Sequence, residues 1–207
     1  EQGAPAKIFT DAEHPYTQKL LAAIPSGKAP ESDEVREPLI TASNLKTYFQ
    51  TQSGNEPVKA VDDVSLEIKR GEVLGLVGES GSGKSTFGRS LLRLTPITDG
   101  NVTFDGIDVG ALGRNDLKVL RRRMQMIFQD PYASLNPRMT VYDTLAEPLL
   151  LHNIATRSTL DAAIKSLMND VGLASAFAKK YPHEFSGGQR QRIAIGRALA
   201  TKPEFIV

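Results

Sequence analysis

The sequence predicts an α/β fold organised around a phosphate-binding loop, and two motifs carry this prediction. Residues 78–86 read GESGSGKST and fit the pattern G-x-x-x-x-G-K-[ST]. Residues 186–189 read SGGQ and stand directly before an amphipathic helical pattern. In both places a glycine-rich turn precedes a helix, and the N-terminus of a helix attracts anions. We therefore expect two phosphate-binding turns in one chain.

Two strands are expected before the first motif. Residues 39–49 and 60–68 are rich in apolar and β-branched residues, as strands are. One apolar face of the second strand is expected to comprise Val61, Val64, Leu66 and Ile68. Residues 1–36 are polar, contain several prolines and include an acidic run at 31–34, which favours a docked tail followed by a linker.

The first motif lies between an apolar run and a helical pattern. Residues 72–77 (EVLGLV) read as a short buried parallel strand, and residues 87–94 read as a helix. This setting disfavours a chance Gly/Ser turn that happens to contain a lysine. Glycines let backbone N–H groups turn inward around phosphate oxygens, while Lys84 reaches the β- and γ-phosphates and Ser85 ligands Mg²⁺. The expected phosphate-binding residues are Gly78, Ser80, Gly81, Ser82, Gly83, Lys84, Ser85 and Thr86, although Thr86 alone is equally consistent with an ordinary helix residue.

The region between the motifs is expected to change from strands to helices. Residues 101–128 predict a strand, a turn at Asp105-Gly106, a short helix and a strand at 124–128. Residues 131–181 are helical in pattern. There we expect Ser158 to cap a helix that Gly172 ends, with apolar residues at helical spacing at Leu160, Ile164, Leu167, Met168 and Val171.

The second motif is weak alone, because Ser-Gly-Gly also occurs in linkers. Residues 189–200 continue it as an amphipathic helix with Ile193, Ala194, Leu199 and Ala200 available for packing. Ser186 then stands at the N-cap position, where its hydroxyl and the following glycine amides form a second anion-binding helix terminus.

With both motifs in this order, the chain resembles the nucleotide-binding domain of ABC transporters. The resemblance implies a P-loop NTPase core with an N-terminal antiparallel β part and a helical subdomain. In this family two domains dimerise head to tail, so the P-loop of one and the signature of the other (Ser186, Gly187, Gly188 and Gln189) hold the same ATP. Gln129, in the run MIFQDP, matches the family's Q-loop glutamine. The resemblance thus implies ATP and Mg²⁺ as ligands, Lys84 and Gln129 as catalytic residues, and Ser85 and Gln129 as metal ligands.

An aromatic residue before the P-loop is expected to stack on the adenine, because the phosphates use backbone contacts and the base needs a flat partner. Tyr48 and Phe49 both end the first strand. Alternation places them on opposite faces, so one of the two is expected to pack into the core. Spacing from residues 44–46 favours Phe49 as the family's A-loop position, with Tyr48 as the alternative.

Other runs resemble the ATPases of oligopeptide and dipeptide importers. These are residues 132–141 (YASLNPRMTV), residues 181–185 (YPHEF) and residues 14–25 (HPYTQKLLAAIP). The last run is similar to the C-terminal end of such ATPases, yet here it precedes a P-loop. The resemblance therefore implies an internal piece of a tandem ATPase. Residues 1–36 would be the tail of a preceding nucleotide-binding domain plus linker, and 37–207 an ABC nucleotide-binding domain with a helical subdomain at about 131–190.

The resemblance also implies that the domain is incomplete at its C-terminus, truncated at the Walker B strand. In the family the apolar strand that Phe205, Ile206 and Val207 match runs into an Asp-Glu pair, the Mg²⁺-binding aspartate and the general-base glutamate. We therefore expect the parent protein to be an ABC-type ATPase and the 207-residue chain alone to bind nucleotide weakly and to hydrolyse none.

The function implied by the resemblance is ATP-driven import of peptides or a related small solute across the bacterial inner membrane. The ATPase would act at the cytoplasmic face, with a second nucleotide-binding domain, transmembrane permease subunits and, indirectly, a periplasmic solute-binding protein. The alternative is a soluble ABC ATPase of the translation or DNA-repair type, against which the importer-like runs argue. A P-loop kinase is excluded by the signature helix.

The composition and charge of the chain exclude several kinds of site and partner. The formal net charge is +1 with both signs interspersed, so no electrostatic case exists for nucleic acid binding. The basic cluster Arg121, Arg122 and Arg123 is expected to be a solvated helix end. The absence of cysteine excludes disulfides and metal-thiolate sites. No apolar run approaches the roughly 18 residues that a membrane span needs.

Overall fold

The structure is a computed structural model that describes residues 1–24, 36–51 and 56–207. The chain divides into two compact units, Glu1–Val35 and Arg36–Val207. This division lies one residue before the expected boundary, and the assignment of the first part to a preceding domain stays a prediction. Most of the expected linker, including its acidic run, lies outside the described residues.

The first unit contains two short helices, α1 (Pro5–Thr10) and α2 (Pro15–Ala22). Each begins with a proline, whose fixed φ suits the first position of a helix. His14 caps α2, because its Nδ1 accepts the N–H of Tyr16 at 3.1 Å. Glu1 ties the unit together by accepting the N–H groups of Glu13 and His14, and these bonds lower the pKa of its carboxyl.

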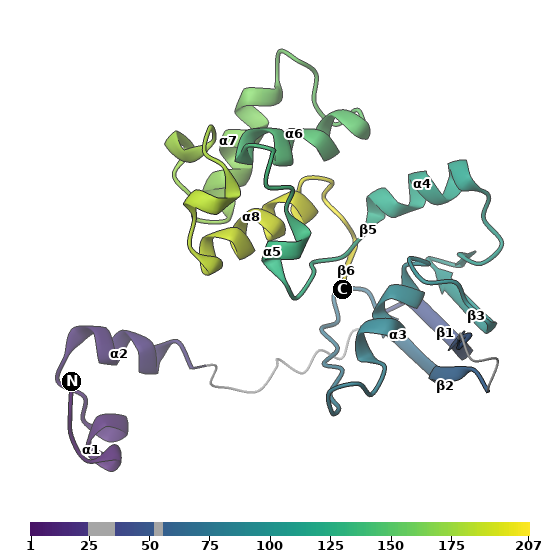
Figure 1. Ribbon diagram of the computed structural model, residues 1–207, viewed down its shortest axis with the longest axis horizontal. Coiled ribbons are helices and arrows are strands. Elements are labelled where there is room, and N and C mark those ends of the chain that lie inside the picture. Colours follow the sequence, from purple (N-terminus) through teal and green to yellow (C-terminus); the bar gives the residue numbers. More distant parts are fainter. Residues whose placement is uncertain (25–35, 52–55) are drawn as a thin grey trace. The chain divides into compact units, whose positions relative to one another are not determined.

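The second unit opens with an antiparallel sheet of β1 (Pro38–Phe49), β2 (Val58–Lys69), β3 (Asp99–Phe104) and β4 (Ile107–Asp108). The strand order is β2-β1-β3-β4. Figure 1 shows β1 between β2 and β3. Both strands expected before the P-loop are confirmed. So is the turn between β3 and β4, because Asp105 and Gly106 adopt φ values of 52° and 76°.

The apolar face expected on β2 is only partly correct. Val61 and Ile68 are buried, but Val64 is 36 % exposed. The ladder shifts between the pairs Leu45–Val64 and Thr47–Val61, and Asp63 takes a φ of 58°. A bulge of this kind interrupts the alternation of side chains, so Val64 leaves the face that simple parity assigned to it.

One hydrophobic core joins the sheet to α3 (Lys84–Leu91) and α4 (Arg114–Arg123). Its members come from both strands and helices, and they include Ile40, Leu45, Phe87, Leu91, Val102, Phe104 and Leu120. The hydroxyls of Thr47 on β1 and Ser90 on α3 share a buried hydrogen bond of 2.8 Å. The helix expected at residues 87–94 is present as α3, but it begins at Lys84, immediately after the glycines of the loop.

Two segments expected as strands differ from that expectation. The strand at 124–128 is reduced to β5 (Met124–Gln125), which pairs in parallel with β6 (Phe205–Ile206). Residues 72–77 form no strand, and Val73 and Val77 are 97 % and 92 % exposed, so the expected buried strand is wrong here. A parallel strand is buried only between neighbouring strands, and no strand of the described residues pairs with this run.

The helical part comprises α5 (Pro131–Ser134), α6 (Val141–Leu151), α7 (Leu160–Asp170), the 3₁₀ turns η1 (Ser175–Phe177) and η2 (Pro182–Glu184), and α8 (Gly187–Leu199). A second core holds it together, with Val141, Leu145, Ile164, Met168 and Ile193 as central members. Ser158 does not cap α7. Thr159 stands at the N-cap without a side-chain cap, and the Ser158 hydroxyl instead bonds that of Thr156 at 2.9 Å.

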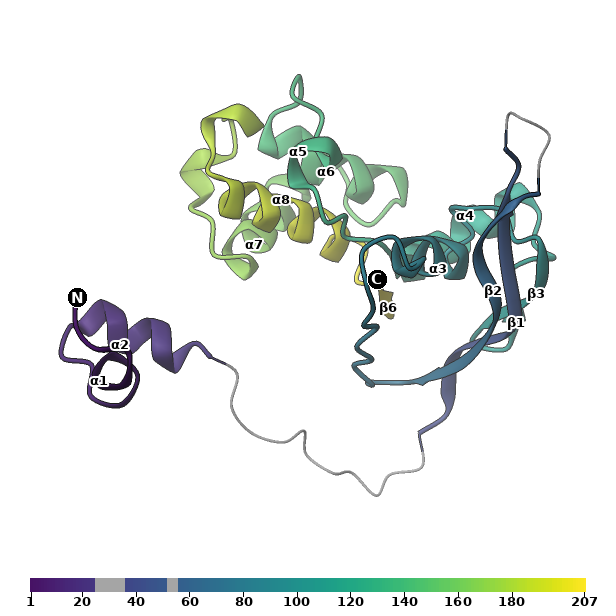
Figure 2. The same ribbon diagram turned by 60° about the horizontal axis from the view of Figure 1, so that its bottom comes forward.

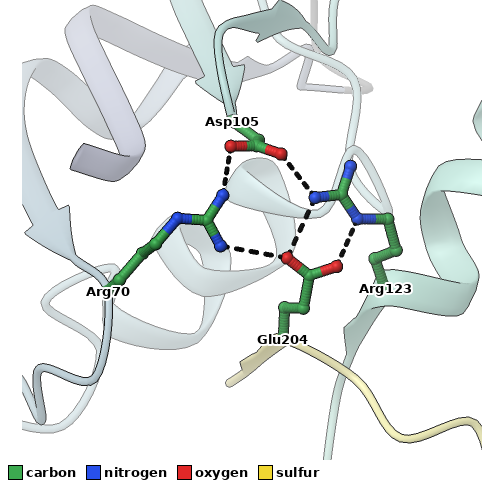
Figure 3. Close-up of polar contacts among 4 residues, drawn as sticks. All are labelled: Arg70, Asp105, Arg123 and Glu204. Carbon is green, nitrogen blue, oxygen red and sulfur yellow. Dashed lines mark hydrogen bonds and ion pairs between the residues drawn. The ribbon is translucent and has the colours of Figure 1, made fainter. Parts of the chain in front are cut away.

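Four charged side chains from distant parts of the chain form one ion-pair network (Figure 3). Arg70 follows β2, Asp105 lies in the β3–β4 turn, Arg123 ends α4, and Glu204 precedes β6. Arg123 bonds Asp105 at 2.5 Å and Glu204 at 2.5 and 2.9 Å, while Arg70 bonds Glu204 at 3.1 Å and also contacts Asp105. Arg123 is thus not part of a solvated helix end.

The network predicts acid sensitivity. Hydrogen bonds from Arg123 and Arg70 lower the pKa of the carboxyls of Asp105 and Glu204. A carboxyl with a depressed folded pKa adds stability above its unfolded pKa, near about 4, and this is lost as pH falls through the folded value. We expect Glu204→Gln to lower the urea midpoint at neutral pH, and the difference from wild type to shrink in acid.

The matched control is Glu67→Gln, because Glu67 is exposed on β2 outside the network. A Glu204→Gln midpoint equal to that of the control at neutral pH would mean that the network does not stabilise the fold.

Candidate functional site

The glycines of the first motif are required by its conformation. Gly81 and Gly83 adopt φ values of 83° and 91°, in the left-handed region that side chains rarely tolerate. A Cβ at Gly83 would also lie 2.1 Å from the carbonyl oxygen of Ala60 on β2. The loop therefore packs directly against β2, and α3 begins at once, with the N–H of Phe87 donating to the carbonyl of Gly83 at 2.8 Å.

Lys84 lies across the loop that precedes it. Its Nζ donates to the carbonyl oxygens of Gly78 and Glu79 at 2.8 and 2.5 Å and to the Ser82 hydroxyl at 3.4 Å. The side chain is half-buried, whereas Ser85 is exposed. A cation held over a glycine turn, next to the unpaired first N–H groups of a helix, makes an anion-binding cradle.

A cavity of about 900 Å³ brings three expected site residues together. Lys84 and Ser85 line it from α3, and Gln129 lines it from the segment after β5. The rest of the lining is largely apolar and includes Leu74, Leu76, Phe87, Phe128 and Val207. A lysine can bond phosphate oxygens, and the oxygens of a serine hydroxyl and a glutamine amide are ligands that suit a hard cation such as Mg²⁺, so the three residues fit a cavity for a nucleotide with its metal.

The signature turn is built as expected, so the N-cap role of Ser186 is confirmed. The Ser186 Oγ accepts the N–H of Gln189 at 3.4 Å, and the Gln189 Oε1 accepts the N–H of Ser186 at 3.0 Å. This reciprocal capping box starts α8. A Cβ at Gly187 or Gly188 would meet no atom within 4 Å. The residues lining the 900 Å³ cavity do not include this turn.

The two aromatic candidates are both accessible, so the expectation that one packs into the core is wrong. Phe49 is 44 % exposed and Tyr48 is half-buried, whereas Thr47 takes the buried position. The ladder is irregular between Thr47 and Tyr48, which breaks the parity argument. The Tyr48 hydroxyl donates to Asp62, and this bond raises the pKa of the tyrosine. Phe49 pairs with Val58, two residues from the Ala60 that the loop contacts.

Comparison with known proteins agrees with this geometry. The ABC transporter family model matches residues 61–207. The chain belongs to the ABC transporter family. It is 56 % identical over 173 residues to the oligopeptide transport ATP-binding protein OppF of Bacillus subtilis, covering 83 % of this chain and 56 % of OppF. It is 43 % identical over 238 residues to the glutathione import ATP-binding protein GsiA of Pectobacterium atrosepticum, covering 100 % of this chain and 38 % of GsiA. The chain thus spans less than two thirds of these relatives.

A solved structure confirms the α/β fold of an ABC ATPase. The ATP-binding cassette MJ0796, a dimer in a post-hydrolysis state bound to ADP and phosphate, superposes with a TM-score of 0.74 at 31 % identity. The match covers 81 % of this chain and 72 % of that chain. In the part of the ABC chain that the structure describes, no helix combines the length and apolarity of a membrane span.

Sequence reasoning missed one contact next to the Q-loop position. The ring of Tyr132, three residues after Gln129, lies 4.0 Å from the guanidinium of Arg190 on α8. Neither residue belongs to a spacing pattern that predicts the pair. The only signal was that both lie beside residues expected to be functional.

Proposed function

We propose that this chain is the ATP-binding part of an importer that uses ATP to move peptides or a related small solute across the bacterial inner membrane. The observation that carries the proposal is the convergence of Lys84, Ser85 and Gln129 on one cavity. The names of OppF and GsiA, an oligopeptide transport and a glutathione import ATP-binding protein, support the transport class.

Lys84, Ser85 and Gln129 each have a role in this proposal. Lys84 exchanges its loop carbonyls for β- and γ-phosphate oxygens, which form stronger charge-assisted bonds with an ammonium. Ser85 and Gln129 would hold Mg²⁺, and Gln129 would orient the attacking water. A bound Mg²⁺ would supply positive charge against the negative charge that develops during phosphoryl transfer. Phe49, or alternatively Tyr48, stacks on the adenine.

The second phosphate site serves a partner domain. Ser186, Gly187 and Gly188 present an exposed, capped helix N-terminus away from the cavity lining. We therefore infer that the signature binds the γ-phosphate of a nucleotide held by a second nucleotide-binding domain, in a head-to-tail dimer. The partners proposed beyond this dimer are permease subunits at the cytoplasmic face and, indirectly, a periplasmic solute-binding protein.

The domain assignment is part of the same proposal. We propose that residues 1–36 are the tail and linker of a preceding nucleotide-binding domain and that 37–207 are the ABC domain, with its helical subdomain at about 131–190. The match to GsiA supports this, because it extends over the whole chain, whereas the match to OppF covers 83 %.

Permease subunits that co-purify with the natural full-length protein would support an importer, and their absence from a membrane-derived preparation would favour a soluble ABC ATPase.

Phosphate release tests the catalytic part. Hydrolysis needs a base and Mg²⁺ ligands besides Lys84, Ser85 and Gln129. We expect the natural full-length protein to release phosphate from saturating Mg-ATP, and the 207-residue chain to release no more than its Lys84→Ala variant. Turnover of the chain above that variant would show that its own residues complete the site.

A further inference from the structure

Two arginines of α8 face the short helix α5. Arg190 and Arg197 are seven residues apart in one continuous helix, so they lie on the same face two turns apart. Figure 1 shows α5 beside α8. Arg190 contacts α5 at Tyr132, and Arg197 contacts it at Ser134. The two helices are therefore joined at two separate points.

Arg190 joins three segments at once. Its guanidinium covers the Tyr132 ring at 4.0 Å. The same group donates through Nε to the carbonyl of Pro182 at 2.7 Å and through Nη2 to the carbonyl of His183 at 3.2 Å. These carbonyls belong to η2, which leads into the signature turn. A guanidinium can bond in its plane and stack on its face, and Arg190 does both.

Arg197 holds the other end of α5. Its Nη1 donates to the carbonyl of Ser134 at 2.7 Å. Burial lowers the pKa of this guanidinium, with Glu147 acting in the opposite direction. The start of α5 is fixed by Asp130, whose Oδ1 accepts the N–H groups of Tyr132 and Ala133 at 2.8 and 3.3 Å. Gln129 immediately precedes this cap.

We propose that Arg190 is a positioning residue, which fastens α5 to α8 through the Tyr132 ring and thereby sets the position of Gln129 relative to the signature turn. The segment that carries the proposed Mg²⁺ ligand and the turn that carries the proposed contact to the second nucleotide then move as one body. The catalytic consequence rests on the proposed function. The mechanical claim, that Arg190 holds α5, rests on the contacts alone.

Amide hydrogen exchange of the 207-residue chain, without nucleotide, tests the mechanical claim. We expect Tyr132→Leu and Arg190→Gln to speed exchange of the amides of Tyr132 (or its replacement) and Ala133 about fivefold, the size expected from loss of one cation–π contact. Tyr132→Phe retains the ring face and is expected to exchange like wild type. The ring is 64 % exposed, so these Tyr132 variants leave the cores intact.

The matched arginine control is Arg192→Gln. Arg192 lies on the same helix but donates to Gly172, not to α5. We expect its α5 amides to exchange at the wild-type rate. Two outcomes would overturn the claim that Arg190 holds α5. One is equal exchange rates in Tyr132→Leu and Tyr132→Phe, and the other is equal acceleration of exchange by Arg190→Gln and Arg192→Gln.

Steady-state kinetics of the natural full-length protein tests the positioning role. If the contact between Arg190 and Tyr132 sets the position of Gln129, Tyr132→Leu lowers kcat for Mg-ATP about fivefold or more and leaves KM within about twofold. Tyr132→Phe then has the kcat of the wild type. An unchanged kcat in a variant with accelerated exchange would overturn the role of Arg190 in catalysis. If instead the proposed function is wrong, the result is different, because the Lys84→Ala variant then releases phosphate as the wild type does.

Discussion

In the natural full-length protein, Lys84→Ala is expected to abolish tight triphosphate binding. The ammonium is the only cation that the loop places over its own backbone, within 2.8 Å of the carbonyl of Gly78. Charge-assisted bonds to phosphate contribute strongly, so the loss should weaken ATP binding by at least about 10- to 100-fold. Binding of AMP, which lacks β- and γ-phosphates, should change far less. Isothermal titration with both nucleotides measures the difference.

The matched control for this prediction is Lys165→Ala. Lys165 is an exposed residue of α7, so its removal alters the net charge equally without touching the loop. Wild-type ATP affinity in Lys84→Ala would refute the assignment of residues 78–86 as the phosphate site.

Ser186→Arg is expected to separate binding from catalysis. Ser186 is exposed and caps α8, and it does not line the cavity of Lys84. In the natural full-length protein, an arginine should block closure on the opposite nucleotide, which stops ATP-dependent dimerisation and hydrolysis. The isolated domain should still bind ATP with near-normal affinity. Analytical ultracentrifugation with and without ATP, together with titration, measures both quantities.

Ser186→Ala controls for the lost cap. It removes the same hydroxyl, at a cost of about 0.5–2 kcal/mol of helix stability, without adding bulk or charge. We expect it to retain more ATP-dependent dimer than Ser186→Arg. Weakened ATP binding to the isolated Ser186→Arg domain would mean that the signature serves the nucleotide of its own chain.

Local signals predicted much of the fold. The capping box at Ser186 and Gln189 and the turn at Asp105-Gly106 were predictable because each depends on residues within a few positions. The P-loop motif was predictable because Gly81 and Gly83 adopt positive φ values and a Cβ at Gly83 would collide with β2. The ABC fold was implied by the family resemblance that these motifs carry, and the match to MJ0796 confirms it.

Long-range effects account for what the sequence did not predict. The bulge near Asp63 moved Val64 outward, and the ladder irregularity at Thr47 left both Tyr48 and Phe49 accessible. Parity assumes a regular ladder, and nothing in the strand sequence marks where it slips. The apolar run 72–77 has the composition of a buried strand, yet burial depends on neighbours that the run itself does not specify.

Ion pairs between distant segments could not be predicted from the sequence either. Arg70 and Arg123 meet Asp105 and Glu204 only because β2, the β3–β4 turn, α4 and β6 converge (Figure 3). Figure 2 shows β1 between β2 and β3 in the sheet that contributes two of these segments. The pairing of Arg190 with Tyr132 likewise requires α5 to lie on α8. In each case the sequence shows the charge but not its partner.

The central claim is that backbone N–H groups of residues 78–86 hold the phosphates of a nucleotide. Two-dimensional amide NMR of the purified chain, titrated with Mg-ATP and separately with Mg-AMP, observes those groups directly. We predict that ATP shifts the amide resonances of Gly81, Gly83, Lys84 and Ser85 most, and that AMP leaves them nearly unchanged. Shifts of equal size with AMP, or ATP-induced shifts confined to residues outside 78–86, would contradict the account.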